Sequence, residues 1–208
     1  MSLVPPDPPL SDGVITLRPL NESDLPTIER AASDAEILRW FDLHTRSPAG
    51  YLAAKHEAWA EGTGASFAIC DATRPDTCLG HVFIERDDDG RGSVGYWLLE
   101  DGRGKGRATR AVRLMASWAL PEMRLGRLQL HTDPENVPSQ RVAERAGFTR
   151  EGVFRGYNVR RDGTRADAFV YSLLPQDLAS ARFASSSQGA GGVGWASGDI
   201  AQFGRGPG

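Results

Sequence analysis

The chain has 208 residues and a formal net charge of −3, a length that suits one domain with a continuous buried core. A negative net charge argues against general affinity for nucleic acid or for anionic membranes. Two cysteines are too few for a disulfide framework or a four-ligand zinc site, and no apolar run approaches the roughly eighteen residues of a membrane span. We therefore expect a soluble cytoplasmic protein without a metal site, a membrane anchor or a nucleic-acid partner.

The two ends of the chain differ in composition from the rest. Residues 1–13 are rich in proline, and residues 185–208 consist mainly of glycine, serine and alanine. Both compositions resist core formation, so we predict two tails that flank one domain of residues 14–184. Trp195 and Phe203 leave open that the second tail docks onto the domain or onto a neighbouring subunit.

The first part of the domain is predicted to be a strand followed by three helices. Apolar and polar residues alternate over residues 14–20, which favours a strand. A capped helix should follow over residues 21–30, and a shorter one over residues 33–40. Ser47 is a good N-cap residue for a third helix that spans residues 48–61 and ends at the next glycine.

The middle of the domain is predicted to be an antiparallel meander followed by a helix. Residues 66–70, 79–85 and 93–99 have strand-like patterns. Residues 108–120 place alanine, leucine, methionine and tryptophan on one face, which predicts an amphipathic helix. Pro121 should end this helix, because proline cannot donate the next hydrogen bond.

The last part continues with a strand at residues 127–131 and a helix at residues 138–146, closed by a glycine. Two further strands are expected near residues 151–159 and 165–173, joined by a turn at residues 161–163. The whole order predicts an α/β domain whose sheet is mostly antiparallel, with one parallel step in the middle.

The segment between the third meander strand and the next helix is the most informative. Gly102, Gly104 and Gly106 let several backbone N–H groups converge, and the helix adds its unpaired first-turn donors and positive dipole end. Such a loop binds phosphate or diphosphate, although a solvated glycine turn with basic neighbours remains an alternative. The spacing fits neither a P-loop nor a dinucleotide-binding fingerprint. Four basic residues surround the loop: Arg103, Lys105, Arg107 and Arg110.

Three separated motifs together resemble one known family. Residues 103–108, Arg-Gly-Lys-Gly-Arg-Ala, resemble the Q/R-x-x-G-x-G/A acyl-CoA motif of the GNAT acetyltransferases. Asn136-x-x-Ser139 and Glu144-x-x-Gly147-Phe148 are similar to segments of the RimJ/RimL-like branch. The resemblance covers about residues 14–178 and implies a GNAT fold with flanking helices, in which two parallel strands of a mixed sheet splay into a V.

The resemblance implies acetyl-CoA as the acyl donor and places several residues around it. Leu98 and Leu99 would offer backbone groups to the pantetheine arm, which lies in the V like an added strand. Asn136 would contact the pantetheine, and Ser139 would lie near the thioester sulfur. Arg145 would meet the outer phosphate, although a solvated helix arginine is an equal alternative. The diphosphate would be bound by Arg103, Gly104, Lys105, Gly106, Arg107, Ala108 and Thr109.

Direct attack of an amine on the thioester requires a neutral amine, a donor for the oxyanion and a proton for the leaving thiolate. The chain departs from common family patterns, because Ala143, Ser93 and Asn158 stand where relatives carry a tyrosine and two carboxylates. The thiolate proton is therefore left to Ser139 or to water. Glu85 is the remaining candidate for the base, acting directly or through water, with an exposed structural glutamate as the alternative.

Trp40, Phe41 and Asp42 lie between the early helices, where related enzymes place an acceptor-binding loop, and Tyr96 is assigned to the same site. Packing of Trp40 into the core is an equal alternative. An α-amine near pKa 7.8 is roughly one tenth neutral at pH 7, whereas lysine is neutral in about one part in 2,500. A site with so few groups that could accept or donate a proton therefore favours a peptide N-terminus or a small molecule with a low-pKa amine.

Several alternatives stay open at this point. The acceptor could be an antibiotic, a polyamine or an amino acid, and the acyl group could be longer than acetyl. The domain could also bind coenzyme A without turnover, as a sensor, or act through its C-terminal tail as an interaction protein. Dimers are common in the branch, so the resemblance includes a homodimer. The four histidines show no metal-ligand spacing and are expected to have surface or packing roles.

Overall fold

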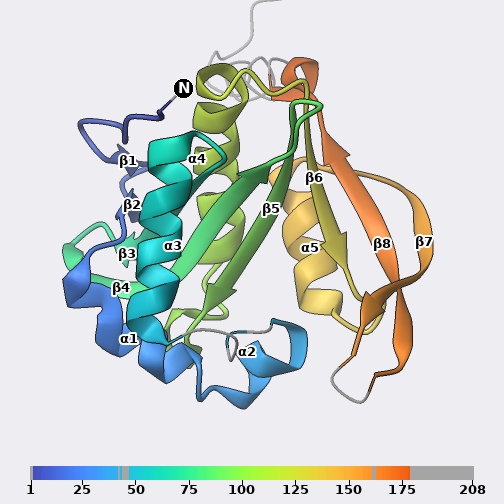
Figure 1. The fold of residues 1–208 in the computed structure, drawn as a ribbon, viewed down its shortest axis with the longest axis horizontal. Helices are drawn as coiled ribbons and strands as arrows, with labels where there is room; N and C mark the ends of the chain where they lie inside the picture. The colour runs from blue at the N-terminus through green and yellow to red at the C-terminus, as the bar shows by residue number, and fades with distance from the viewer. Residues whose placement is uncertain (1, 42, 44–46, 161–162, 179–208) are drawn as a thin grey trace, which may run out of the picture.

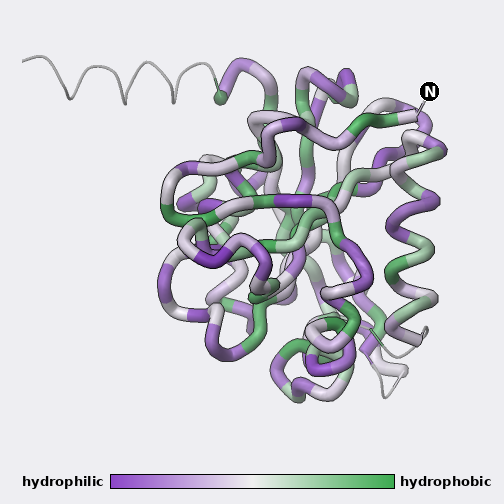
Figure 2. Tube along the Cα trace, turned by 90° about the vertical axis from the view of Figure 1, so that its left-hand side faces the viewer, coloured by the Kyte–Doolittle hydropathy of each residue, from purple (hydrophilic) through white to green (hydrophobic). Residues whose placement is uncertain are grey.

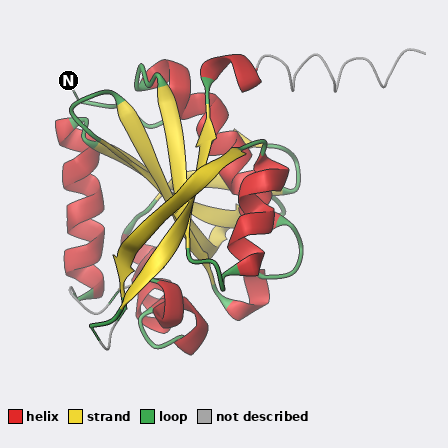
Figure 3. Ribbon diagram, turned by 90° about the vertical axis from the view of Figure 1, so that its right-hand side faces the viewer, coloured by secondary structure: helices red, strands yellow, loops and turns green. Residues whose placement is uncertain are grey.

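The computed structural model describes residues 2–41, 43, 47–160 and 163–178. These residues form one eight-stranded sheet in the order β1-β2-β3-β4-β5-β6-β8-β7, with helices on both faces (Figure 1). Seen from the side, helices pack against both faces of the strands (Figure 3). Hydrophobic and hydrophilic residues alternate along the chain (Figure 2), as expected of elements that bury one face. Within the described part of the chain, no helix combines the length and the apolar character needed to cross a membrane.

The predicted first strand and three helices are all present, and capping side chains fix where the helical segments begin. Asn21, Asp34 and Ser47 each accept a hydrogen bond from a backbone N–H of the following turn. The third helix ends at Gly62, whose φ of +76° suits glycine. The elements are β1 (Leu10–Ser11), β2 (Ile15–Pro19), a 3-10 turn (Glu22–Asp24), α1 (Leu25–Ala31), α2 (Ala35–Trp40) and α3 (Pro48–Glu61).

The proline-rich N-terminal segment is in contact with the sheet and core. Strand β1 belongs to it and pairs antiparallel with β2. The N–H of Leu3 donates to the carbonyl of Trp59 at 3.0 Å, and the side chains of Leu3 and Leu10 pack against the main core. These isolated leucines supply apolar contacts that the overall proline content does not reveal.

Six further strands complete the sheet, and the predicted meander is confirmed. β3, β4 and β5 pair antiparallel in chain order, β6 pairs with β8, and β7 forms the outer edge. Of the predicted hairpin turn, Arg161 and Asp162 lie outside the described residues. The strands are β3 (Gly64–Asp71), β4 (Arg74–Arg86), β5 (Arg91–Leu98), β6 (Arg127–Thr132), β7 (Thr149–Val159) and β8 (Arg165–Leu173).

In the second half of the chain, the described residues include the helices α4 and α5. Helix α4 (Arg107–Glu122) continues through Pro121, so the prediction that this proline ends the helix is wrong. In the last turn, proline removes only the hydrogen bond that its own N–H would have made, and the N–H of Met123 still donates to Ala119 at 2.9 Å. Helix α5 (Val137–Ala146) ends at the predicted glycine, with φ of +97°.

The one parallel contact of the sheet is short. β5 and β6 pair only over Arg91–Arg127, Gly92–Leu128 and Ser93–Gln129, after which both strands continue without pairing to each other. The two strands separate visibly beyond this point (Figure 1). The predicted mixed sheet with a splayed parallel pair and flanking helices is therefore confirmed.

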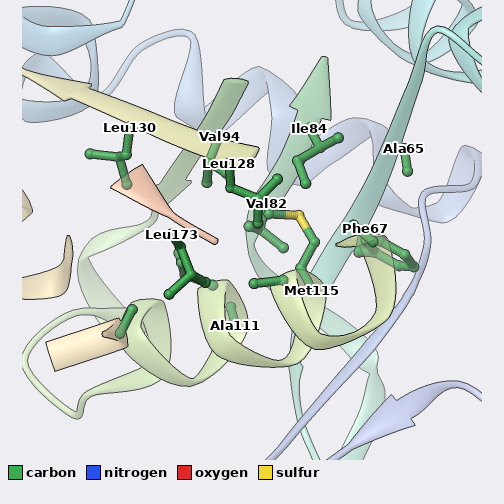
Figure 4. Packing of buried hydrophobic residues seen from close by; sticks show 14 of the residues in the cluster. Ala65, Phe67, Val82, Ile84, Val94, Ala111, Met115, Leu128, Leu130 and Leu173 are labelled. Atoms are coloured by element: carbon green, nitrogen blue, oxygen red, sulfur yellow. The ribbon is translucent and has the colours of Figure 1, made fainter. Parts of the chain in front are cut away.

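The core is divided by the sheet into two clusters. On one face, α4 and α5 cover a cluster that includes Phe67, Val82, Met115 and Leu173 (Figure 4). On the other face, α1, α2 and α3 cover a smaller cluster around Trp97. Both sides of β5 are thus supported by packed side chains, which holds the strand in place next to its unpaired edge.

Candidate active site

The glycine loop leads from β5 through a short 3-10 turn (Glu100–Gly102) into α4. Gly104 and Gly106 have φ of +75° and +70°, and a Cβ on either would meet no heavy atom within 4 Å. Among the described residues, no side chain caps the first turn of α4. Its N–H groups are therefore open to a ligand at the positive end of the helix dipole, which favours an anion.

A hollow of about 480 Å³ lies beside this loop, along the outer side of α4. Gly106 borders it, together with the side chains of Arg110, Arg113 and Arg145. Arg113 donates to the carbonyl of Arg145, and Arg110 is paired with Asp12 at 2.6 Å. The hollow combines main-chain donors with three guanidinium groups, so it suits a ligand that carries several phosphates.

The two predicted arginines of the loop itself hold the loop in place. Arg103 donates to Asp34 at 2.7 Å and to the carbonyl of Leu98 at 2.9 Å. Arg107 is buried and pairs with Asp71 at 2.7 Å. Both carboxylates belong to distant segments, so no local pattern could have identified them. Lys105 remains exposed.

The unpaired edge of β5 offers main-chain groups to the gap. The N–H of Leu99 donates to Leu79 of β4 at 2.9 Å, so this predicted residue is engaged within the sheet. Because hydrogen-bond direction alternates along a strand, Tyr96 and Leu98 direct their N–H and C=O groups away from β4. These groups point to the side from which β6 has departed, although the carbonyl of Leu98 already accepts from Arg103.

A pair of hydroxyl groups spans the gap on the face of α4 and α5. The Tyr96 hydroxyl donates to Oγ of Ser139, in the first turn of α5, at 2.9 Å. Burial raises the pKa of Tyr96 to about 12, which keeps this donor protonated near neutral pH. Since Oγ accepts this bond, Ser139 retains its own proton for donation elsewhere. Asn136 caps the same helix, because its side chain accepts from the N–H of Ser139 at 3.1 Å.

A second cavity, of about 700 Å³, lies on the opposite face between α3 and strands β4 and β5. We call it the acceptor cavity, because Phe41, which is predicted from the sequence to bind the acceptor, lines it. Glu85 lies at this cavity with 63% of its side chain exposed, and its carboxylate is 3.0 Å from the ammonium of Lys55. Lys55 is 14% exposed and lies 4.1 Å from the ring centroid of Phe83. The cavity is thus lined by charged and aromatic side chains.

Of the described residues that are predicted to bind the acceptor, Phe41 lines this cavity, whereas Trp40 and Tyr96 do not. Phe41 lines the cavity and packs edge-to-face on Phe83, with ring centroids 5.6 Å apart. The indole of Trp40 instead donates to Glu36 at 3.0 Å. Tyr96 lies on the other face with Ser139, and Asp42 lies outside the described residues.

Tyr51, which lines the cavity, is hydrogen-bonded to the buried side chain of His81. Nδ1 of His81 is 2.7 Å from the Tyr51 hydroxyl, which also accepts from the indole N–H of Trp97 at 3.4 Å. Burial lowers the pKa of His81 well below its usual value, so the ring is neutral. Nearby, a Cβ on Gly95 would lie 2.2 Å from the Phe83 ring, so only glycine allows the ring to occupy this place.

Metal chemistry receives no support from the geometry. Within the described ranges, no group of three or more histidine, cysteine or acidic side chains is arranged to hold a metal ion. Cys70 and Cys78 are buried free thiols, and burial raises their pKa to about 11 and about 12, respectively. Neither is set up as a nucleophile, because the reactive form is the thiolate.

Comparison with known proteins identifies the family. A model of the acetyltransferase (GNAT) domain matches residues 15–149, more than half of the chain. The chain therefore belongs to the GNAT acetyltransferase family, whose members use acetyl-CoA. N-acetyltransferase p20 of Bacillus licheniformis is 26% identical over 172 residues, which are 79% of this chain and 95% of p20. YjcK of Bacillus subtilis, named as an N-acetyltransferase, is 40% identical over 84 residues, and the chain covers only 46% of its length.

Solved structures place the fold within the family more closely. RimJ of Mycobacterium smegmatis, solved with a CoA-disulfide, is similar with a TM-score of 0.71 and 23% identity, covering 86% of this chain and 93% of RimJ. An acetyltransferase of Salmonella typhimurium that modifies the N-terminal serine of a ribosomal protein has a TM-score of 0.69 and 19% identity, covering 80% and 97%. These likenesses, at 23% and 19% identity, show that the chain shares the fold of these acetyltransferases.

Proposed function

We propose that the chain transfers an acetyl group from acetyl-CoA to a primary amine, with the N-terminus of a protein as the acceptor. The observation that carries this proposal is the unpaired stretch of β5. It lies between the Tyr96–Ser139 hydroxyl pair on one face of the sheet and the acceptor cavity on the other. A thioester held in this gap would be open to attack from one face and to protonation from the opposite one.

The donor would be bound mainly by main-chain groups. The open N–H groups of Gly104, Gly106 and the first turn of α4 suit the diphosphate, and this agrees with the loop's positive φ angles and empty surroundings. Arg145 and its neighbours along the hollow suit the outer phosphate. The free edge of β5 at Tyr96 and Leu98 would hydrogen-bond the pantetheine as an added strand.

The transfer step would use the two faces in sequence. A backbone N–H at the β5 edge would stabilise the oxyanion as the amine attacks the carbonyl carbon. When the carbon–sulfur bond breaks, Ser139 would give its proton to the thiolate. Tyr96 supports this role, because its hydroxyl hydrogen bond orients Oγ and leaves the serine proton unused.

An α-amine fits this site better than a lysine side chain. The attacking nitrogen needs a free lone pair, so the acceptor has to react as the neutral amine. The neutral fraction at pH 7 is roughly one tenth for an α-amine and about one in 2,500 for lysine. Two of the similar structures, in Salmonella typhimurium and Vibrio fischeri, are named for N-terminal or ribosomal-protein acetylation. A small molecule with a low-pKa amine is the second candidate acceptor.

The proposal is tested by measuring free thiol released from acetyl-CoA. Short peptides that begin with serine or alanine should stimulate release, more strongly than the same peptides with a blocked N-terminus and one lysine. Calorimetry on the same protein should detect binding of coenzyme A. Tight binding without release under any amine would point to a sensor, and absence of binding would refute the whole assignment.

A further inference from the structure

His131 is directed into the acceptor cavity by the geometry of β6. It follows Gln129, the last residue of β6 that pairs with β5, by two positions. Leu128 and Leu130 point into the core under α4 and α5, so alternation along the strand turns His131 to the opposite face, where it lines the cavity. Gly95 of β5, which has no side chain to fill the opening, lines the same cavity.

The surroundings of the ring fix its chemical state. Its Nε2 is buried and has no hydrogen-bond partner in the part of the chain that the structure describes. The ring packs against Phe154 and Tyr157 of β7, with centroids 5.6 Å and 4.9 Å away. Burial and the nearby charge of Arg127 lower the pKa of His131, so the imidazole is neutral at pH 7.

A neutral imidazole has one N–H and one lone pair, and the enclosure of Nε2 decides where each lies. We assign the N–H to Nε2, the buried nitrogen of a ring that packs against Phe154 and Tyr157, since aromatic rings accept weak hydrogen bonds. Nδ1 then keeps the lone pair. Because His131 lines the acceptor cavity, we take Nδ1 as the nitrogen that accepts a proton there.

The other titratable groups of the cavity are less suited to take a proton. The carboxylate of Glu85 is paired with Lys55 and directed toward solvent. The Tyr51 hydroxyl is engaged with His81, and burial raises its pKa. The remaining charged groups at the cavity or near the ring are exposed or lie on β6, and they are Glu57, Glu61, Arg86 and Arg127. The neighbours of the ring on β7 and β8 include Tyr157 and Val170.

We infer that Nδ1 of His131 accepts the proton of the attacking amine, an inference that rests on the proposed function. In this step a C–N bond forms at the thioester carbonyl and the C–S bond breaks. One amine proton passes to His131, and the thiolate takes the proton of Ser139. The proton on His131 then passes through water to Ser139 when the products leave, which restores both side chains, so the step balances without any further reactant.

The test compares His131→Gln with Glu85→Gln, a matched change at the base predicted from the sequence. For both variants and the wild type, kcat is measured from pH 5.5 to 9 with a peptide acceptor, and coenzyme A affinity is measured by calorimetry. Because the titration of the acceptor is common to all three proteins, the ratio of wild-type to variant kcat isolates the enzyme group.

The expected result is a loss of about 100-fold in kcat for His131→Gln at pH 7.5, a typical contribution of a general base. The ratio should fall toward one at the acid end of the range, once the pH drops below the lowered pKa of wild-type His131 and the ring no longer accepts a proton. Glu85→Gln should lose much less kcat than His131→Gln and should not reproduce its pH dependence, and both variants should bind coenzyme A as the wild type does.

Three results would decide against the inference. A His131→Gln variant within about threefold of the wild type overturns it, as does a pH-independent ratio or a large loss in Glu85→Gln alone. If His131→Gln does not fold, His131→Ala is assayed with added imidazole, and a rate that imidazole does not restore overturns it too. A wild type that releases no thiol with any amine refutes the proposed function itself and the inference with it, an outcome that is visible before any variant is made.

Discussion

The two faces of the sheet offer different kinds of groups to a ligand. On the face of α4, the open donors come from one contiguous loop and are mostly main-chain groups around Gly104 and Gly106. On the face of α3, the acceptor cavity is assembled from side chains of distant segments, among them Phe41, Lys55 and His131. The proposed donor site would therefore depend on backbone shape and the proposed acceptor site on side-chain identity, so substitutions should affect one without the other.

The largest effect is expected from a substitution in the proposed donor loop, which tests whether the two sites are independent. Gly106→Asp places a carboxylate beside the proposed diphosphate, and like charges about 4 Å apart repel by about 4 kcal/mol at an effective dielectric constant of 20. Coenzyme A affinity in calorimetry should fall at least about 100-fold. Gly90→Asp is the matched control, because Gly90 also has a positive φ and open surroundings but lies in the β4–β5 turn. Equal affinity for both variants would contradict the placement.

The Tyr96–Ser139 hydroxyl pair lies beside the gap on the face of α4 and α5, and substitutions in it should change turnover without changing coenzyme A affinity. Ser139→Ala should lower kcat about 30-fold with coenzyme A affinity unchanged, since it removes the proposed proton donor. Tyr96→Phe should have a smaller effect, and adding it to Ser139→Ala should cost little more, because both act on one proton. Fully additive losses in steady-state assays would show that the two hydroxyls work independently.

On the acceptor side, Phe41→Ala should raise the acceptor KM about tenfold. The substitution removes the edge-to-face contact with Phe83 and opens the cavity wall, a loss of about 1 kcal/mol or more. Affinity for coenzyme A should not change, and Trp40→Ala, which alters a ring outside the cavity lining, serves as the comparison. A matching loss in donor affinity would show that the faces are coupled.

The smallest effect is expected for a substitution of Arg145, which lines the hollow beside α4. Arg145→Gln should weaken coenzyme A binding about fivefold, consistent with about 1 kcal/mol for an exposed ion pair. Binding of dephospho-coenzyme A, which lacks the outer phosphate, should stay the same. A similar loss for both ligands in parallel titrations would place Arg145 elsewhere on the coenzyme.

The contrast between the faces also explains what the sequence could predict. The meander, the caps of the early helices and the loop from Gly102 to Gly106 depend on short-range patterns, and the structure contains them. The ion pairs of Arg103 and Arg107 depend on Asp34 and Asp71, which only the fold brings close. Long-range placement was beyond sequence reasoning.

The acceptor side shows the same limit in two residues. From the sequence, Tyr96 is assigned to the acceptor site, and the structure places its hydroxyl against Ser139 on the other face of the sheet. His131 was expected to have a surface or packing role, because the four histidines show no metal-ligand spacing. Alternation along β6 was a usable signal, since the leucines on either side already mark the core face.

The fit of Gly95 against Phe83 suggests how the acceptor range of this scaffold could be altered. A methyl group at Gly95 would overlap the ring, so Phe83 would have to swing into the cavity and narrow it. Exchanging Phe83 for a smaller aliphatic residue in the same variant would return that volume. Together, the residues at these two positions would set the width of the cavity. The cavity could then be adapted to bulkier amines while the glycine loop stays unchanged.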